Sequence, residues 1–180
     1  SSSIVGNTIG TNLAGTSYLS NGIDGIRIDN GLGNTVGPNN WISGNVQSGV
    51  HFNNLEFGGS NTVIANSFGL TPAGASLPAN GSTGILLEHS NNNVIGKPGL
   101  GNVVSNNAGS GNLTSVGIEL IASTGNLIQS NLVGTDPTGT SDRGNNVGIY
   151  LHDASTGNTI GGTAANTGNT ASGNDDANIQ

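Results

Sequence analysis

Short stretches of alternating aliphatic and polar residues recur along the chain, and a glycine introduces each one. The pattern glycine, aliphatic, any residue, aliphatic begins at Gly25, Gly49, Gly84, Gly117 and Gly148. A period of two places both aliphatic side chains of a stretch on the same face of a β-strand. Since one short strand cannot bury that face by itself, the pattern predicts strands stacked on equivalent strands.

The spacing of these stretches indicates a solenoid. Successive glycines lie 24, 35, 33 and 31 residues apart, and a longer repeat relates residues 7–10, 66–69 and 131–134 at spacings of 59 and 65 residues. Such internal periods are typical of repeat architectures. We predict an all-β protein, a right-handed parallel β-helix of about six coils with three short strands per coil. Residues 1–180 are expected to form a single domain that is a fragment or protomer of a longer assembly.

Stacking of the coils would align equivalent aliphatic residues in two internal columns. The first predicted column contains Ile26, Val50, Ile85, Ile118 and Ile149, and the second contains Ile28, Phe52, Leu87, Leu120 and Leu151. A buried aliphatic side chain contributes about 1.5–3 kcal/mol. The columns therefore outweigh the sparse charges as the drive to fold.

Asparagine, with 29 occurrences, is the commonest polar residue, and it has a regular place beside the strands. One set precedes inward-facing aliphatic positions: Asn34, Asn61, Asn93, Asn126 and Asn158. Asparagine bonds nearby backbone groups at bends, and stacked asparagines bond one another. We predict an asparagine ladder along the axis. The glycine before each strand is expected to permit a sharp corner.

Charge limits the possible partners. Charged residues make up 7% of the chain, the net charge is −7, and only Arg27, Lys97 and Arg143 are basic. Nucleic-acid binding requires a basic surface, so this class is excluded. No apolar run reaches 18 residues, so no membrane insertion is expected. Cysteine and the calcium-binding Gly-Gly-x-Gly-x-Asp motif are missing, and we expect neither a metal nor another cofactor.

Three strings carry a resemblance to a known family. They read NTIG at 158–161, GTDPTGT at 134–140 and ISGN at 42–45. The chain resembles the right-handed parallel β-helix repeats of the pectate-lyase-like superfamily, and more closely bacterial secreted and surface proteins rich in these strings. The resemblance implies the β-helix fold and an extracellular or cell-surface location. It leaves function open, because the superfamily includes lyases, hydrolases, adhesins, phage spikes and inert stalks.

The outward positions of the strands form a candidate saccharide strip. Its members are Arg27, Asp29, His51, Glu88, His89, Glu119, Tyr150 and His152, which include all three histidines of the chain. The alternative interpretation is a solvated outer face. Coils stack at about 4.8 Å, so Asp29 and Glu88 would lie about 10 Å apart, beyond the roughly 6.5–9.5 Å of an inverting glycosidase. The catalytic motifs of polygalacturonase-like enzymes are missing, and we predict no catalytic residue.

We therefore expect a non-catalytic extracellular β-helix, namely a stalk, fibre or adhesive scaffold of microbial origin. The alternative is a module that binds or cleaves polysaccharide through the strip. A minor alternative is an ice-binding face built from Thr8, Thr35, Thr62 and Thr159, which Val94 and Leu127 interrupt. Expected partners are copies of the chain stacked end to end, the remaining parts of a longer chain, or polysaccharide.

Overall fold

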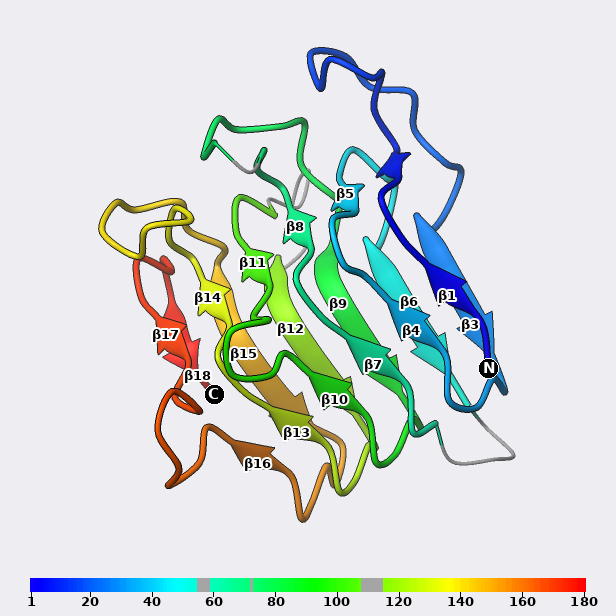
Figure 1. The fold of residues 1–180 in the computed structure, drawn as a ribbon, viewed down its shortest axis with the longest axis vertical. Coiled ribbons are helices and arrows are strands. Elements are labelled where there is room, and N and C mark those ends of the chain that lie inside the picture. The colour runs from blue at the N-terminus through cyan, green and yellow to red at the C-terminus, as the bar shows by residue number, and fades with distance from the viewer. Residues whose placement is uncertain (55–58, 72, 108–114) are drawn as a thin grey trace.

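The protein forms a parallel β-solenoid, as seen in a computed structural model that describes residues 1–54, 59–71, 73–107 and 115–180. Three parallel sheets contain six strands each, and no helix occurs in the described residues. Every third strand along the chain joins the same sheet, so each coil contributes one strand to each sheet (Figure 1). The chain makes five full turns from β1 to β16. This all-β architecture confirms the predicted fold class and is consistent with the right-handed parallel β-helix.

The strands are short in two sheets and longer in the third. The first sheet contains β1 (Ser3–Ile4), β4 (Thr35–Val36), β7 (Thr62–Val63), β10 (Val94–Ile95), β13 (Leu127–Ile128) and β16 (Thr159–Ile160). The second contains β2 (Thr8–Ile9), β5 (Trp41–Ile42), β8 (Ser67–Phe68), β11 (Val103–Val104), β14 (Leu132–Val133) and β17 (Thr170–Ala171). The third contains β3 (Ile26–Asp29), β6 (Val50–Asn53), β9 (Thr83–Glu88), β12 (Val116–Ile121), β15 (Val147–His152) and β18 (Ala177–Ile179).

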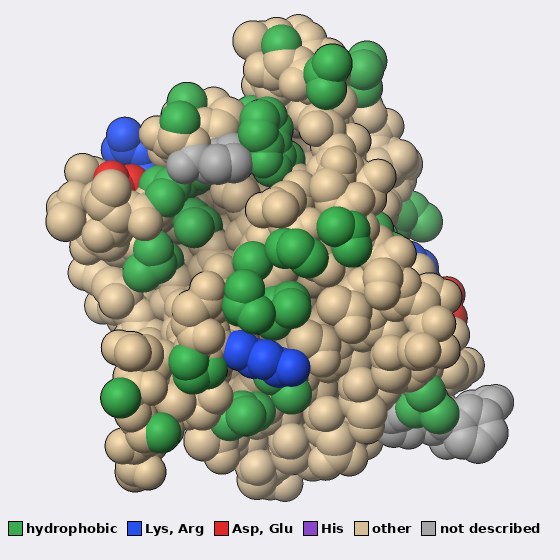
Figure 2. All heavy atoms as spheres, in the orientation of Figure 1, with side chains coloured by type: hydrophobic (Ala, Val, Ile, Leu, Met, Phe, Trp, Pro, Cys, Tyr) green, Lys and Arg blue, Asp and Glu red, His purple; other side chains and the backbone are tan. Residues whose placement is uncertain are grey.

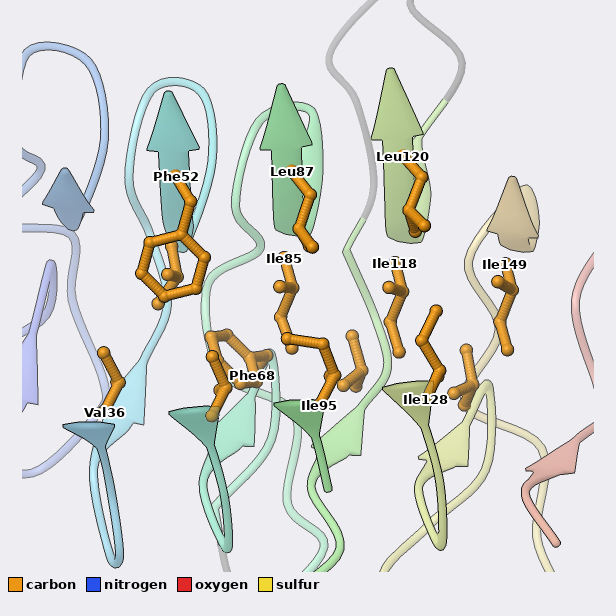
Figure 3. Packing of buried hydrophobic residues seen from close by; sticks show 14 of the residues in the cluster. Val36, Phe52, Phe68, Ile85, Leu87, Ile95, Ile118, Leu120, Ile128 and Ile149 are labelled. Atoms are coloured by element: carbon orange, nitrogen blue, oxygen red, sulfur yellow. The ribbon is translucent and has the colours of Figure 1, made fainter. Parts of the chain in front are cut away.

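The core consists of aliphatic columns, one coil above the next. In the third sheet the register aligns Ile26, Val50, Ile85, Ile118 and Ile149 in one column and Ile28, Phe52, Leu87, Leu120 and Leu151 in the other. These side chains meet those of the other two sheets, such as Val36, Phe68 and Ile128, in the interior (Figure 3). Because only the period-two faces point inward, the opposite faces remain available for polar residues.

The glycines before the third-sheet strands are required because a Cβ at these positions would clash with neighbouring atoms, and not because of their backbone conformation. Gly84, for example, does not have a positive φ, so the expected sharp left-handed corner is not its role. A Cβ at Gly84 would lie 2.6 Å from Val104 and 2.7 Å from the carbonyl oxygen of Gly117. The same crowding surrounds Gly49 and Gly117. Glycine at this corner therefore lets the third sheet approach the second closely.

Three asparagine ladders, not one, run along the corners of the solenoid. The predicted ladder through Asn34, Asn61, Asn93, Asn126 and Asn158 is present, with amide-to-amide distances of 2.9–3.3 Å. A second ladder comprises Asn7, Asn40, Asn66, Asn102, Asn131 and Asn169. A third comprises Asn21, Asn45, Asn80, Asn107, Asn145 and Asn174. In each ladder the side-chain NH₂ group donates to the side-chain oxygen of the following coil, so all three have the same polarity.

The long sequence repeat corresponds to two coils. Asn7, Asn66 and Asn131 are alternate members of the second ladder, so their spacing spans two windings. After β2, β8 and β14 the chain forms similar loops, each closed by an antiparallel bridge. The base of every loop is fixed by a bond to the carbonyl oxygen of the glycine that follows the strand, at 2.9–3.0 Å. Alternate coils therefore carry these loops on one side of the solenoid.

The threonine column proposed for an ice-binding face is partly wrong. Thr35, Thr62 and Thr159 lie in the first sheet, in one column that Val94 and Leu127 interrupt. Thr8 lies in β2 of the second sheet, where it pairs with Trp41. The similar sequence around Thr8 reflects the Asn that precedes strands in both sheets.

Candidate functional site on the outer face of the third sheet

The third sheet presents two outward columns of side chains. One contains Arg27, His51, Leu86, Glu119 and Tyr150, and the next contains Asp29, Asn53, Glu88, Ile121 and His152. We call these two columns the strip. The opposite side of the molecule differs, since few charged side chains and no histidine are visible there (Figure 2). The strip therefore concentrates ionisable groups of an otherwise weakly charged protein.

A first network is centred on His51. The side chain of His51 is only 8% exposed, and its two ring nitrogens each lie 3.1 Å from a carboxylate oxygen. Nδ1 faces Asp24 and Nε2 faces Glu88. The ring of His51 therefore lies between two carboxylates that come from different coils. Because these residues come from successive coils, the network links three coils.

Asp24 and Arg27 complete this network. The Asp24 side chain is 1% exposed. Burial raises the pKa of Asp24, but hydrogen bonds from His51 and the Ser48 backbone outweigh burial and lower the pKa below its ordinary value. Arg27 donates to Asp29 at 2.9 Å, which raises the pKa of Arg27. Arg27 also lies 3.5 Å from Asp24 and 3.3 Å from the His51 ring.

A second network is centred on Glu119. Thr83 donates its hydroxyl to Glu119 Oε2 at 2.8 Å, and His152 Nε2 lies 3.1 Å from Glu119 Oε1. The other ring nitrogen of His152 lies 3.3 Å from Asp153. Tyr150 stacks on His152, with ring centroids 4.4 Å apart and an interplanar angle of 23°. Thr83, Glu119 and His152 belong to successive coils, so this network also links three coils.

Seven of the eight strip residues predicted from the sequence belong to the two networks. Arg27, Asp29, His51 and Glu88 lie in the first, and Glu119, Tyr150 and His152 lie in the second. His89 follows the end of β9 with a left-handed φ of 50°, and it joins neither network within the described residues.

Sequence analysis missed Asp24 and Thr83 as partners of the strip. Each residue comes immediately before the glycine that starts a strand pattern, at Gly25 and Gly84. This position was not counted as outward, because strict alternation would place it inside. A Cβ at Gly84 would point at the core residue Val104, so the glycine occupies the inward position. Thr83 is fully buried, but its hydroxyl contacts Glu119 of the outer face. A polar residue before the glycine is the signal that could have identified both.

The carboxylates of the strip lie close to basic partners. Asp29 and Glu88 are two strands apart, and each has a basic partner within its own network. In the described part of the chain, no group of three or more histidine, aspartate or glutamate residues is arranged to hold a metal ion. The histidines of the two networks have carboxylates at both ring nitrogens.

Two hollows lie away from the strip, one along the second sheet and one beside the third ladder at Asn45. One, of about 230 Å³, is lined by Asn39, Asn40, Trp41, Ala65, Asn66, Ser67, Gly101, Val103 and Pro137. The other, of about 290 Å³, is lined by Tyr18, Ser20, Gly44, Asn45, Val46, Ala79 and Gly81. Neither set contains a strip residue or a charged side chain. The hollows therefore do not supply a substrate pocket for the ionisable groups.

Comparison with protein-family models, with curated proteins and with solved structures found no match for the chain. The described residues contain no helix of the length and hydrophobicity needed to span a membrane.

Proposed function

We propose that the chain is a non-catalytic structural β-helix, a stalk, fibre or adhesive scaffold that acts outside a microbial cell. The supporting observation is the pairing within the strip. His51 contacts Asp24 and Glu88, and Glu119 contacts Thr83 and His152. These contacts join side chains from successive coils. Here the ionisable groups serve as ties between coils.

The extracellular location rests on the resemblance to bacterial secreted and surface β-helix proteins of the pectate-lyase-like superfamily. The ladders also support a scaffold role, since most of their side chains are buried and bonded to both neighbouring coils. Polar groups of this kind stabilise only when all of them are satisfied. The ladder asparagines therefore make the solenoid rigid by tying each coil to its neighbours.

Two variants of the strip test the scaffold role. His51→Ala removes the contacts between three coils, whereas Asp29→Asn removes a charge that is 56% exposed and bonded to Arg27 of the same strand. We expect His51→Ala to lower the melting temperature and Asp29→Asn to leave it nearly unchanged. Wild-type chain should show neither lyase nor glycosidase activity on a panel of polysaccharides. Turnover by the wild type that His51→Ala abolishes without loss of folding would contradict the proposal.

A scaffold of this type would continue along its axis. In the described chain, β1, β2 and β3 at one end and β16, β17 and β18 at the other pair with a strand on one side only. Further coils, from other copies or from remaining parts of a longer chain, would extend the same sheets. Sedimentation velocity over a range of concentrations tests the stacking of copies. Growth into longer particles would support it, and a monomer at every concentration would contradict it.

Saccharide binding is the second candidate function, and one observation favours it. Tyr150 stacks on His152, and the stack remains partly exposed on the strip. An aromatic face with polar groups at its edge suits a sugar ring. A glycan array with the wild type and Tyr150→Ala tests it. Binding that Tyr150→Ala removes at unchanged stability would support this second function and would add a ligand to the scaffold.

A further inference from the structure

Two asparagines of the third ladder are followed directly by glycine. Asn21 precedes Gly22 and Asn80 precedes Gly81, whereas each of the other ladder asparagines is followed by a residue with a side chain.

An Asn–Gly pair can deamidate, because glycine has no side chain to keep its backbone nitrogen from approaching the asparagine Cγ. Attack forms the N–Cγ bond and expels ammonia, giving a succinimide. Water then opens that ring to aspartate or isoaspartate. The only co-reactant is solvent water.

The fold protects Asn80 from this reaction. Asn80 is fully buried, and its NH₂ group donates to the Ile42 carbonyl oxygen at 3.2 Å and to Asn107 Oδ1 at 2.9 Å. Its side-chain oxygen accepts from Asn45 Nδ2 at 2.8 Å. The Gly81 nitrogen, which would be the nucleophile, donates to the Asn45 carbonyl oxygen at 2.9 Å. Ring closure would break these bonds in a buried site, where unsatisfied polar groups are costly.

Asn21 has no comparable protection. Asn21 and Gly22 are both exposed, in the segment between β2 and β3. The Asn21 side chain has one hydrogen bond in the described structure, from Nδ2 to Asn45 Oδ1 at 2.8 Å. We propose that Asn21 is a site of spontaneous deamidation in the folded protein, and that Asn80 reacts only after unfolding.

The modification would act on the ladder itself. A carboxylate at position 21 has no hydrogen to donate, so its oxygen would face Asn45 Oδ1 with two acceptors in contact. The first link of the third ladder is lost, and one negative charge is added. The remaining links, from Asn45 onward, are unchanged. Deamidation at Asn21 therefore loosens the first coil without unfolding the others.

Peptide mapping by mass spectrometry tests the proposal. Folded chain and urea-unfolded chain are incubated in mildly alkaline buffer, sampled over time, digested, and assayed for aspartate and isoaspartate at both positions. We expect conversion at Asn21 in both samples and at Asn80 only in the unfolded one. Conversion of Asn80 at the same rate as Asn21 in the folded chain would overturn the proposal, as would survival of Asn21 in the folded chain while the unfolded chain is converted.

Gly22→Ala provides the matched control. A Cβ at Gly22 meets nothing within 4 Å, so the variant should fold normally. The added methyl group hinders the approach of the nitrogen to Cγ, so conversion at Asn21 should slow. An unchanged rate in this variant, with a normal melting temperature, would also count against the proposal. The third Asn–Gly pair, Asn30–Gly31, lies outside the ladders and serves as an internal reference in the same digest.

Discussion

A substitution at the centre of a ladder separates hydrogen bonding from packing. Asn102 is fully buried. Its NH₂ group donates to the Val63 carbonyl oxygen and to Asn131 Oδ1, both at 2.9 Å. Its oxygen accepts from the backbone and side-chain nitrogens of Asn66 at 3.0 and 3.1 Å. Asn102→Leu keeps the number and branching of the side-chain heavy atoms and removes all four bonds, and Asn102→Asp removes only the two donated ones.

The two variants should lose stability for different reasons. Asn102→Leu leaves two Asn66 hydrogens without acceptors, and at about 1–3 kcal/mol for each buried group the cost is about 2–6 kcal/mol. Asn102→Asp leaves Asn66 satisfied but places a carboxylate against two acceptor oxygens. Burial and these oxygens raise the pKa of the new carboxyl, and a rise of about two pH units corresponds to about 3 kcal/mol at neutral pH.

The raised pKa of the new carboxyl determines how the stability of Asn102→Asp depends on pH. The folded pKa of the new carboxyl is raised, so the unfolded chain releases the proton more readily. The protonated form is therefore favoured by folding, and Asn102→Asp should be closest to the wild type below the unfolded pKa of about 3.9. Its deficit should grow as pH rises through the folded pKa. The deficit of Asn102→Leu should not change with pH.

Urea denaturation followed by far-UV circular dichroism, with both variants and the wild type at each pH, measures these differences. A repeat protein can unfold in stages, so the transition midpoints relative to the wild type are compared. The same pH profile for the aspartate and leucine variants would contradict a raised pKa at position 102. A midpoint of Asn102→Asp equal to that of the wild type at neutral pH would show that the donated bonds contribute nothing.

Three further predictions concern corners, core and charge. Gly84→Ala should cost about 1–3 kcal/mol because its Cβ would lie 2.6 Å from Val104, whereas Gly22→Ala, with open space around it, should not lower the urea midpoint. Phe68→Ala should cost about 3–5 kcal/mol by opening a cavity in the core, measured in the same urea titration. The lowered pKa of Asp24 means that its contribution is complete above its ordinary pKa of about 3.9 and is lost as pH falls through the folded value. Asp24→Asn should therefore flatten the acid limb of the melting-temperature profile, and an unchanged acid limb would contradict this assignment.

The inner columns could be predicted from the sequence because two local signals agree. The period-two pattern identifies which residues point inward, and the glycine before it fixes the register between coils of unequal length. Ile26 and Val50 align despite a different spacing from that between Val50 and Ile85. Loops absorb the difference, since an insertion on the surface does not disturb the stacked strands.

The second and third ladders were harder to predict, although their asparagines are plain in the sequence. In the second ladder, Asn40 precedes Trp41 and Asn102 precedes Val103, so the following residue gives no common signature. In the third ladder the distance to the strand varies, from five residues between Asn45 and Val50 to four between Asn145 and Ile149. The bonds join residues about one coil apart, and no local pattern encodes that partner.

The pairing within the strip could not be predicted for a related reason. The sequence places His51 and Glu88 on one outer face, but the contact depends on rotamers and on the stacking of two coils. The buried partner Asp24 comes from the position before the glycine, where alternation is interrupted. Composition could show that charge is concentrated on the strip. The pairing of these charges depends on contacts between coils that form only in the folded protein.

The two networks meet on one strand, and this explains how the outer face supports the ladders. Glu88 ends the first network and Thr83 begins the second, and both belong to β9. The networks together therefore connect five successive coils along the third sheet, from Asp24 to His152. In a solenoid each coil contacts only its neighbours, so stability is a sum of neighbour terms. The asparagine ladders at the corners contribute one set of interactions between neighbouring coils, and their neutral amides do not respond to pH. The strip contributes a second set, which is made by ionisable groups. Acid should therefore weaken the outer face of the third sheet first, while the ladders continue to hold the coils in register.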